Sequence, residues 1–227
     1  NAVLDGFTLT GGCTLAEGHV VNKRTGGGVW SDEGGKSLVT NCVITGCSAD
    51  DAGGGFYNIG TLAQTTVTNC TALFGGAGSG AALIENCAIV NNRSVRDGGG
   101  IYSGIAMRDT LVSGNAAGER GGGMYSVAWV ECCTVIGNSA QQYGGVVGGD
   151  ILNSIVYYNT DHFGSPNHAM PVYGWFTNSC TTPNPWGAGN ITNAPAFVDQ
   201  INRNPRLSAI SPCINAGFNA FAPPGLD

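Results

Sequence analysis

The chain has 227 residues, of which 42% are hydrophobic, so it can bury a substantial core as one domain. Its 38 glycines and its low share of charged residues (11%) exclude a mainly helical protein, because glycine costs about 1 kcal/mol at each position inside a helix. The net charge of −6, without a Lys/Arg run or an apolar run long enough to cross a bilayer, argues against nucleic acid as a partner and against a membrane span.

One unit repeats along the chain and is clearest in the middle. Its two best copies are NCAIVNNRSVRDGGGIYSGIAMR (86–108) and DTLVSGNAAGERGGGMYSVAWVE (109–131), with corresponding residues 23 positions apart, and a third copy begins at 132. A fixed period of this length is typical of a solenoid, so we interpret the other segments as diverged copies. In chain order, the predicted segments are a first turn at 3–30 with an insertion at 15–24, a second turn at 38–57, a short third turn at 66–82, the three regular copies, a polar loop at 160–171, a last strand-like stretch at 172–180 and a tail at 195–217.

The first half of each unit predicts a short strand around a dipeptide whose second residue is Cys, Thr or Ser. Apolar and polar residues alternate there, which places this second residue on the inner face with the aliphatic side chains. The second half begins with glycines, which allow a positive φ or a close backbone approach at a corner, and it continues as a strand. The dipeptides are Asn41–Cys42, Asn69–Cys70, Asn86–Cys87, Asp109–Thr110, Cys132–Cys133 and Asn153–Ser154.

Such short strands, separated by corners, are expected to stack on their equivalents one unit later, parallel and about 4.8 Å apart. The sequence therefore predicts an all-β fold, a single-domain right-handed parallel β-helix of about seven turns, with the hand taken from the general rule for parallel crossovers. Residues 1–180 would form the turns. Residues 181–227 would form a C-terminal capping segment and tail, which hides the last apolar layer of the core.

Stacking would also align like residues into columns. Stacked asparagine side chains can hydrogen-bond each other and the corner backbone, so we predict an asparagine ladder that stabilises the corners. Its members are Asn92, Asn115, Asn138 and Asn159, with Cys47 and Gly75 at the equivalent positions of earlier turns.

The nine cysteines are expected to stack in the same way, because neighbouring turns bring Cα atoms within the range that a disulfide permits. We predict mostly free thiols with one or two disulfides, and Cys180–Cys213 is the best candidate for a disulfide that fastens the cap. No spacing of Cys or His indicates a metal site. The predicted columns are Cys42, Cys70, Cys87 and Cys133 at one inward position, and Cys13 and Cys47 at another.

The recurring NCxI and GGGIY motifs, the opening LDGFTLTGG (4–12) and the closing PAFVD…RLSAISPCINAG (195–217) resemble the right-handed parallel β-helix surface proteins of bacteria. Polymorphic outer-membrane proteins and other autotransporter-like passengers carry a similar repeat. The resemblance covers nearly the whole chain. It implies a secreted or bacterial cell-surface location, often as one segment of a longer protein.

An aromatic residue follows the inward apolar residue in four of the units, so these rings are expected to face outward in a row. Flat exposed rings suit a polysaccharide or a cell-surface glycan, because the C–H faces of sugars stack on them. Alternatively, the rings stack on each other and shield the sheet. The row consists of Trp30, Tyr57, Tyr102 and Tyr125.

Charged side chains gather at one corner. There Arg96 is expected to lie over Glu119, and Asp97 beside Arg120, as ion pairs between turns that are worth under about 1 kcal/mol each. The same group could instead supply the acid and base of a polysaccharide lyase or a glycoside hydrolase.

The remaining polar residues give little sign of a site. His162 and His168 fall in the polar loop, where we expect them to be solvated. We predict no cofactor. The adjacent Asp50 and Asp51 could bind calcium, but nothing else in the sequence supports such a site.

The low charge and the regular columns favour a non-catalytic extracellular module for adhesion, glycan binding or structural assembly. Structural assembly includes a filament subunit that associates end to end, because an open strand edge is a template for another chain. The alternative is a polysaccharide lyase or glycoside hydrolase of the β-helix type, for which the sequence offers no catalytic residues that stand apart from the corner charges.

Overall fold

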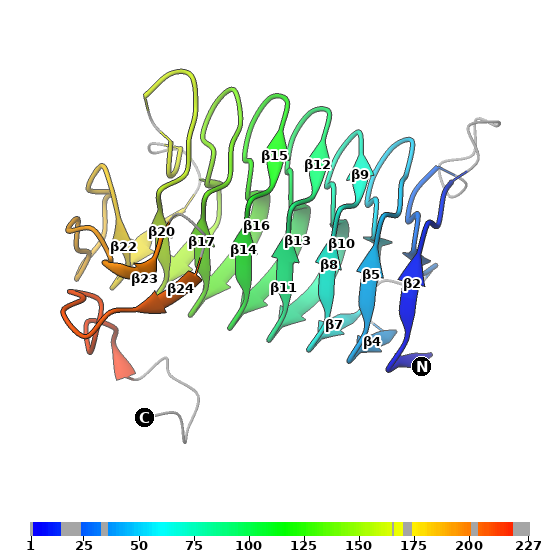
Figure 1. Ribbon diagram of the computed structural model, residues 1–227, viewed down its shortest axis with the longest axis horizontal. Coiled ribbons are helices and arrows are strands. Elements are labelled where there is room, and N and C mark those ends of the chain that lie inside the picture. Colours follow the sequence, from blue (N-terminus) through cyan, green and yellow to red (C-terminus); the bar gives the residue numbers. More distant parts are fainter. Residues whose placement is uncertain are drawn as a thin grey trace.

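The computed structural model describes residues 2–14, 24–32, 36–164, 166–169, 174–200 and 204–219. These residues fold into an all-β solenoid of parallel stacked strands, a right-handed parallel β-helix, which confirms the predicted fold class. Figure 1 shows the turns side by side, from β2 (Thr8–Thr10) at the N-terminal end to β22 (Cys180–Thr181) at the other. No helix capable of crossing a membrane occurs among the described residues.

Three parallel sheets run along the solenoid, one strand of each per regular turn. Sheet 1 is the longest, and three short strands, β3 (Val29–Trp30), β6 (Phe56–Tyr57) and β18 (Val146–Val147), extend it sideways. Its main order is β1 (Val3–Asp5), β4 (Leu38–Thr40), β7 (Thr61–Ala63), β10 (Gly78–Glu85), β13 (Ile101–Arg108), β16 (Met124–Glu131), β19 (Asp150–Leu152) and β21 (Phe176–Thr177).

Sheet 2 forms the opposite wall of the core. Sheet 3 is a short ladder in the middle turns and lies above sheet 2 in Figure 1. Sheet 3 consists of β9 (Thr71–Ala72), β12 (Arg93–Ser94) and β15 (Ala116–Ala117). Sheet 2 runs β2, β5 (Val43–Thr45), β8 (Thr66–Thr68), β11 (Ala88–Val90), β14 (Leu111–Ser113), β17 (Thr134–Ile136), β20 (Ile155–Tyr157) and β22.

The strand register shows that the early turns are more regular in length than the predicted dipeptides indicate. Ile44 pairs with Val67, and Val67 pairs with Ile89, so the dipeptide equivalent to Asn41–Cys42 is Gln64–Thr65. The prediction that used Asn69–Cys70 was therefore wrong by one corner. With this correction the dipeptides begin at 41, 64 and 86, and the early turns have nearly the same length as the regular copies.

Two corners of each turn share the same local backbone conformation, which explains this error. Asn41 and Asn69 both have a positive φ, 51° and 54°, and each precedes a buried cysteine. Asparagine tolerates this left-handed conformation better than most residues. The two corners therefore look alike in sequence, and only the pairing of the strands tells them apart.

The core is a double row of aliphatic side chains, one row from sheet 1 and one from sheet 2. These side chains are almost completely shielded from water, and burial of one such side chain stabilises a fold by about 1.5–3 kcal/mol. Residues Leu62, Ile84, Met107 and Val130 belong to the first row, and Ile44, Val67, Ile89, Val112 and Val135 belong to the second.

A column of thiols and hydroxyls lines the corner between sheets 1 and 2, and it replaces the predicted cysteine column. The Thr110 hydroxyl accepts a hydrogen bond from the backbone N–H of Cys87, and the Ser154 hydroxyl accepts one from Cys133. Cys70 does not belong here. The predicted second column was also wrong, because the exposed Cys13 pairs with Ser48 and not with Cys47. The column reads Cys42, Thr65, Cys87, Thr110, Cys133, Ser154 and Ser179.

The asparagine ladder is confirmed at the next corner, except that Cys70 and not Gly75 occupies the position before Asn92. Asn115 shows the pattern. Its side-chain oxygen accepts the backbone N–H of Asn92 at 2.9 Å, and its side-chain nitrogen donates to the carbonyl of Ile89 at 2.8 Å. The ladder continues through Asn138 and Asn159 and ends at Asn167.

The glycines that open the second half of each unit lie where the two walls of the solenoid touch. A Cβ atom on Gly122 would come within 2.2 Å of the Ser139 carbonyl oxygen and 2.5 Å of the Gly144 carbonyl oxygen. Gly99 faces the backbone of Ala116 similarly closely. The predicted close backbone approach is thus confirmed. At Gly99 and Gly122 the neighbouring backbone leaves no room for a side chain.

Two parts of the predicted capping segment have different positions. Residues 186–191 add a partial rung over the last turn, with hydrogen bonds such as Asn178 N–H to the Ala188 carbonyl at 2.9 Å. The antiparallel hairpin of β23 (Phe197–Asp199) and β24 (Asn204–Leu207) lies beside sheet 2 near β20 and β22 (Figure 1).

Candidate functional site

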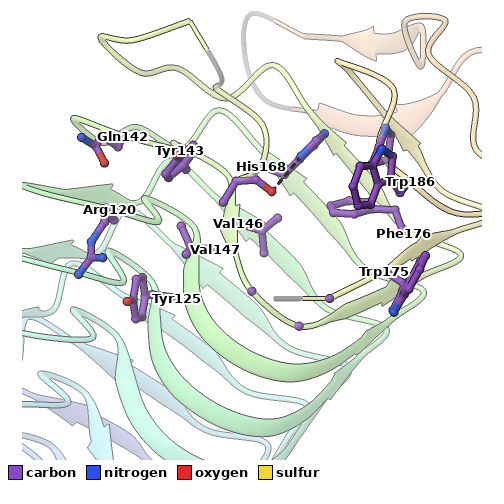
Figure 2. A pocket seen from close by; sticks show the side chains of 15 residues that line it. Arg120, Tyr125, Gln142, Tyr143, Val146, Val147, His168, Trp175, Phe176 and Trp186 are labelled. Carbon is purple, nitrogen blue, oxygen red and sulfur yellow. Dashed lines mark hydrogen bonds between the residues drawn. The ribbon is translucent and has the colours of Figure 1, made fainter. Parts of the chain in front are cut away.

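A cleft of about 410 Å³ opens at the C-terminal end of sheet 1, where the regular repeat stops (Figure 2). Trp175 and Trp186 stand at its rim with 61% and 65% of their surfaces exposed. Tyr125 from β16 lines the opposite side. This volume is within the usual range for small-molecule sites.

The cleft exists because the aromatic row ends at β16, two strands before the end of sheet 1. Val147 in β18 pairs with Tyr125, so an aliphatic side chain follows the last ring of the row. Gly148 and Gly149 then bend the chain with φ values of 78° and 95° and add no side-chain bulk. A hydrogen bond of 3.0 Å from the Trp175 backbone N–H to the Asp150 carboxylate holds the rim segment against the next strand.

The predicted aromatic row is only partly continuous. Trp30 pairs with Tyr57, but Ser79 lies between Tyr57 and Tyr102 and interrupts the row. Tyr102 and Tyr125 stack with ring centroids 5.5 Å apart and an angle of 9° between the rings. Of the four predicted ring residues, Tyr125 is the one that lines the cleft.

The predicted charged corner forms the two expected ion pairs. Arg96 binds Glu119 at 2.9 Å, and Arg120 binds both carboxylate oxygens of Asp97 at 3.1 and 2.9 Å. The first pair is exposed on both sides and is worth under about 1 kcal/mol. The second joins a half-exposed guanidinium group to a buried carboxylate.

Arg120 connects this corner to the cleft. Its guanidinium group lies 4.9 Å from the centroid of the Tyr125 ring, and the hydrogen bonds from Arg120 to Asp97 raise the Arg120 pKa above its ordinary value. The ion pair and the ring contact together fix the position of the guanidinium group. The arginine is therefore pre-positioned to donate hydrogen bonds to a ligand, while Asp97 neutralises its charge.

His168 is buried at the cleft and is not the solvated loop residue that the sequence predicted. Its ring packs on Phe176 with centroids 4.7 Å apart, and its Nε2 lies 2.9 Å from the Pro183 carbonyl oxygen. This nitrogen therefore donates the proton of the neutral ring. Burial lowers the His168 pKa, because the charged imidazolium would lose its hydration.

Stability should consequently fall as the solution is acidified below about pH 6.5. The unfolded chain then takes up a proton on His168 that the folded protein binds only at lower pH, so the folded state loses up to about 1.4 kcal/mol per pH unit until its own lower pKa is reached. Urea unfolding of the wild type and of His168→Gln between about pH 5 and pH 8 measures this slope. Identical pH dependence in both proteins would show that His168 is not responsible.

The structure brings Cys180 and Cys213 together, as predicted for the cap. Both side chains line one hollow of about 300 Å³ between the tail and the last turn, although they lie far apart in the sequence. Both are thiols, and the disulfide stays a prediction. Within the described ranges, no group of three or more His, Cys, Asp or Glu side chains is arranged to hold a metal ion, near Asp50 and Asp51 or elsewhere.

Sequence reasoning missed the two tryptophans at the rim. Trp175 lies in the last strand-like stretch and Trp186 in the capping segment, so neither belongs to a column that the repeat defines. One signal was available: two of the four tryptophans of the chain lie close together in a segment of low regularity.

Comparison with known protein families, curated proteins and solved structures finds no match to this chain. The chemistry of the cleft therefore follows from its own residues alone. They offer exposed ring faces, the side-chain amide of Gln142, the phenol of Tyr143 and a neutralised arginine. These groups can stack on a ligand and hydrogen-bond it.

Proposed function

We propose that the chain is a non-catalytic glycan-binding module of a secreted or cell-surface β-helix protein, and that the cleft is its binding site. The observation that carries this proposal is the pair of largely exposed tryptophans, Trp175 and Trp186, at the rim of a concave site. Exposed aromatic surface is costly in water, and ring faces at a concave site suit the C–H faces of sugars.

The polar groups of the cleft suit a neutral glycan better than a uronate. Arg120 is the charged residue that lines the cleft in the described part of the chain, and Asp97 neutralises it through two hydrogen bonds. Gln142 and Tyr143 can hydrogen-bond sugar hydroxyls without a charge. Adhesion would follow if the glycan belongs to another cell, and the secreted location rests on the resemblance to bacterial surface proteins.

The enzymatic alternative has less support. A glycoside hydrolase needs two carboxyl groups on either side of the bond that it cleaves. The predicted carboxylates Asp97 and Glu119 each accept hydrogen bonds from an arginine, and neither lines the cleft. Release of unsaturated uronates from pectin or alginate would nevertheless establish a lyase and overturn the non-catalytic proposal.

Affinity electrophoresis in gels that contain neutral β-glucan, xylan, mannan, pectin or alginate tests binding directly. We expect retardation by at least one neutral polysaccharide, and a loss of affinity of about tenfold or more in Trp186→Ala and in Trp175→Ala. A tenfold loss corresponds to about 1.4 kcal/mol, which is close to what one ring contact contributes.

Trp30→Ala is the matched control, because Trp30 is also exposed (38%) but lies near the other end of sheet 1 and outside the cleft. It should bind as the wild type does. Equal loss in Trp30→Ala and Trp186→Ala, or no retardation by any polysaccharide, would contradict the proposed site.

A further inference from the structure

The C-terminal tail, defined here as residues 204–219, is held to the solenoid by a few specific contacts. The side chain of Asn153 donates to the Phe218 carbonyl at 3.0 Å and accepts the Phe218 N–H at 2.9 Å. Large apolar side chains of the tail remain in solvent, with Ile210 exposed by 88%. The tail thus buries little apolar surface, and an additional fastening would matter to it.

Cys180 and Cys213 meet where the tail reaches the last turn of sheet 2. Cys180 is buried at the start of β22, and its thiol lies 3.3 Å from the Asn193 carbonyl oxygen. Cys213 is half-buried in the tail. Both line a hollow of about 300 Å³ between the tail and the solenoid corner at Asn178, so a small reagent can approach.

We propose that Cys180 and Cys213 form a thiol–disulfide exchange site that fastens the tail to the solenoid, with a small disulfide of the glutathione class as the oxidant. The Cys213 thiolate attacks one sulfur of that disulfide and releases the other as a thiolate, which takes up a proton. The Cys180 thiol, on losing its own proton, then attacks the Cys213 sulfur and expels the second small thiol. Two protein thiols are oxidised to one disulfide, and one small disulfide is reduced to two thiols.

The environments of the two thiols assign these roles. Cys213 is half-buried at the hollow and Cys180 is buried, and the neighbouring Cys180 thiol lowers the pKa of Cys213 because it stabilises the thiolate. The Cys213 thiol and burial raise the pKa of Cys180. The accessible thiol with the lowered pKa is the better attacking group, and its buried neighbour is the resolving thiol.

The interior cysteines lack this chemistry. Burial raises the pKa of Cys70 to about 12 and that of Cys87 to about 11, so both stay protonated and shielded at neutral pH. The exposed Cys13 lies near the N-terminal end of the solenoid, paired with Ser48, far along the stack from the tail. It serves as the control.

The experiment equilibrates the full chain with oxidised and reduced glutathione and reads the products by intact-mass and peptide mass spectrometry. We expect a loss of two hydrogen atoms (about 2 Da) and a peptide that links Cys180 to Cys213. Cys180→Ser and Cys213→Ser should lose this product, and Cys13→Ser should retain it.

Limited trypsin digestion then tests the fastening. Arg206 is exposed in β24, and its cleavage requires the hairpin and tail to open locally. Oxidation should slow cleavage after Arg206 about tenfold in the wild type and in Cys13→Ser. It should leave the cleavage rate of Cys213→Ser unchanged. Cys213 is half-buried, so its replacement by serine carries little risk of misfolding.

Three results would overturn the inference. They are glutathione adducts on Cys213 without the internal disulfide, an internal disulfide that also disappears in Cys13→Ser, and equal cleavage of the oxidised and reduced chains. Each is independent of polysaccharide binding, so the exchange site and the glycan cleft can fail separately.

Discussion

Asn115→Leu is expected to lower the free energy of unfolding by about 3 kcal/mol or more. Asn115 is completely buried, and leucine has no polar atoms with which to replace its hydrogen bonds. The substitution would leave the backbone N–H of Asn92 and the carbonyl of Ile89 without their partners. Each buried polar group that loses its partner costs about 1–3 kcal/mol.

The effect should spread beyond one turn, because the asparagine ladder links consecutive turns. Asn115 also donates to the side-chain oxygen of Asn138, which stands one turn further along. Urea unfolding followed by circular dichroism measures the change. Asn184→Leu is the matched control, since Asn184 is exposed near the C-terminal end, and it should stay within about 0.5 kcal/mol of the wild type. Equal stabilities of the two variants would mean that the ladder does not hold the turns together.

Gly122→Ala is expected to destabilise the protein by about 3 kcal/mol or more, at the upper end of the usual cost of overpacking. The new methyl group would overlap the carbonyl oxygens of Ser139 and Gly144, which are both backbone atoms in hydrogen-bonded turns. Backbone cannot move aside as a flexible side chain does, so the turns must separate or the corner must distort. Thermal and urea unfolding should show the loss, together with a lower yield of folded protein.

Gly46→Asn separates this steric effect from the loss of a glycine as such. Gly46 has a φ of 63°, and a Cβ there would meet no atom within 4 Å. The equivalent corner positions one and two turns later carry Asn69 and Asn91, with φ values of 54° and 57°. The variant should therefore remain within about 0.5 kcal/mol of the wild type, as surface substitutions without such contacts usually do. A loss as large as that of Gly122→Ala would refute the contact argument.

Within the repeats, most features could be predicted because the structure contacts itself at the repeat period. Residues such as Val112 and Val135 occupy the same position in successive copies of the unit and are directly paired in sheet 2. The asparagine ladder and the ion pairs between neighbouring turns follow for the same reason. The period of the sequence thus predicts which residues of neighbouring turns are in contact.

The predictions failed where two positions of one turn have the same local chemistry. Asn69–Cys70 matches Asn41–Cys42 in sequence, but it lies at the next corner and joins the asparagine ladder. The predicted cysteine column was wrong for this reason. Local propensity gives the conformation of such a corner, whereas the pairing of whole strands gives its place in the turn.

The amino-acid sequence was sufficient to predict the winding, the inner faces of the strands and the line of glycines, since its period places like residues over one another. Three features became visible only in the folded chain: the corner that each dipeptide occupies, the burial of His168, and the cleft with Trp175 and Trp186 at its rim. The histidine and the tryptophans lie beyond the regular turns, and side-chain packing that no repeat encodes fixes their contacts.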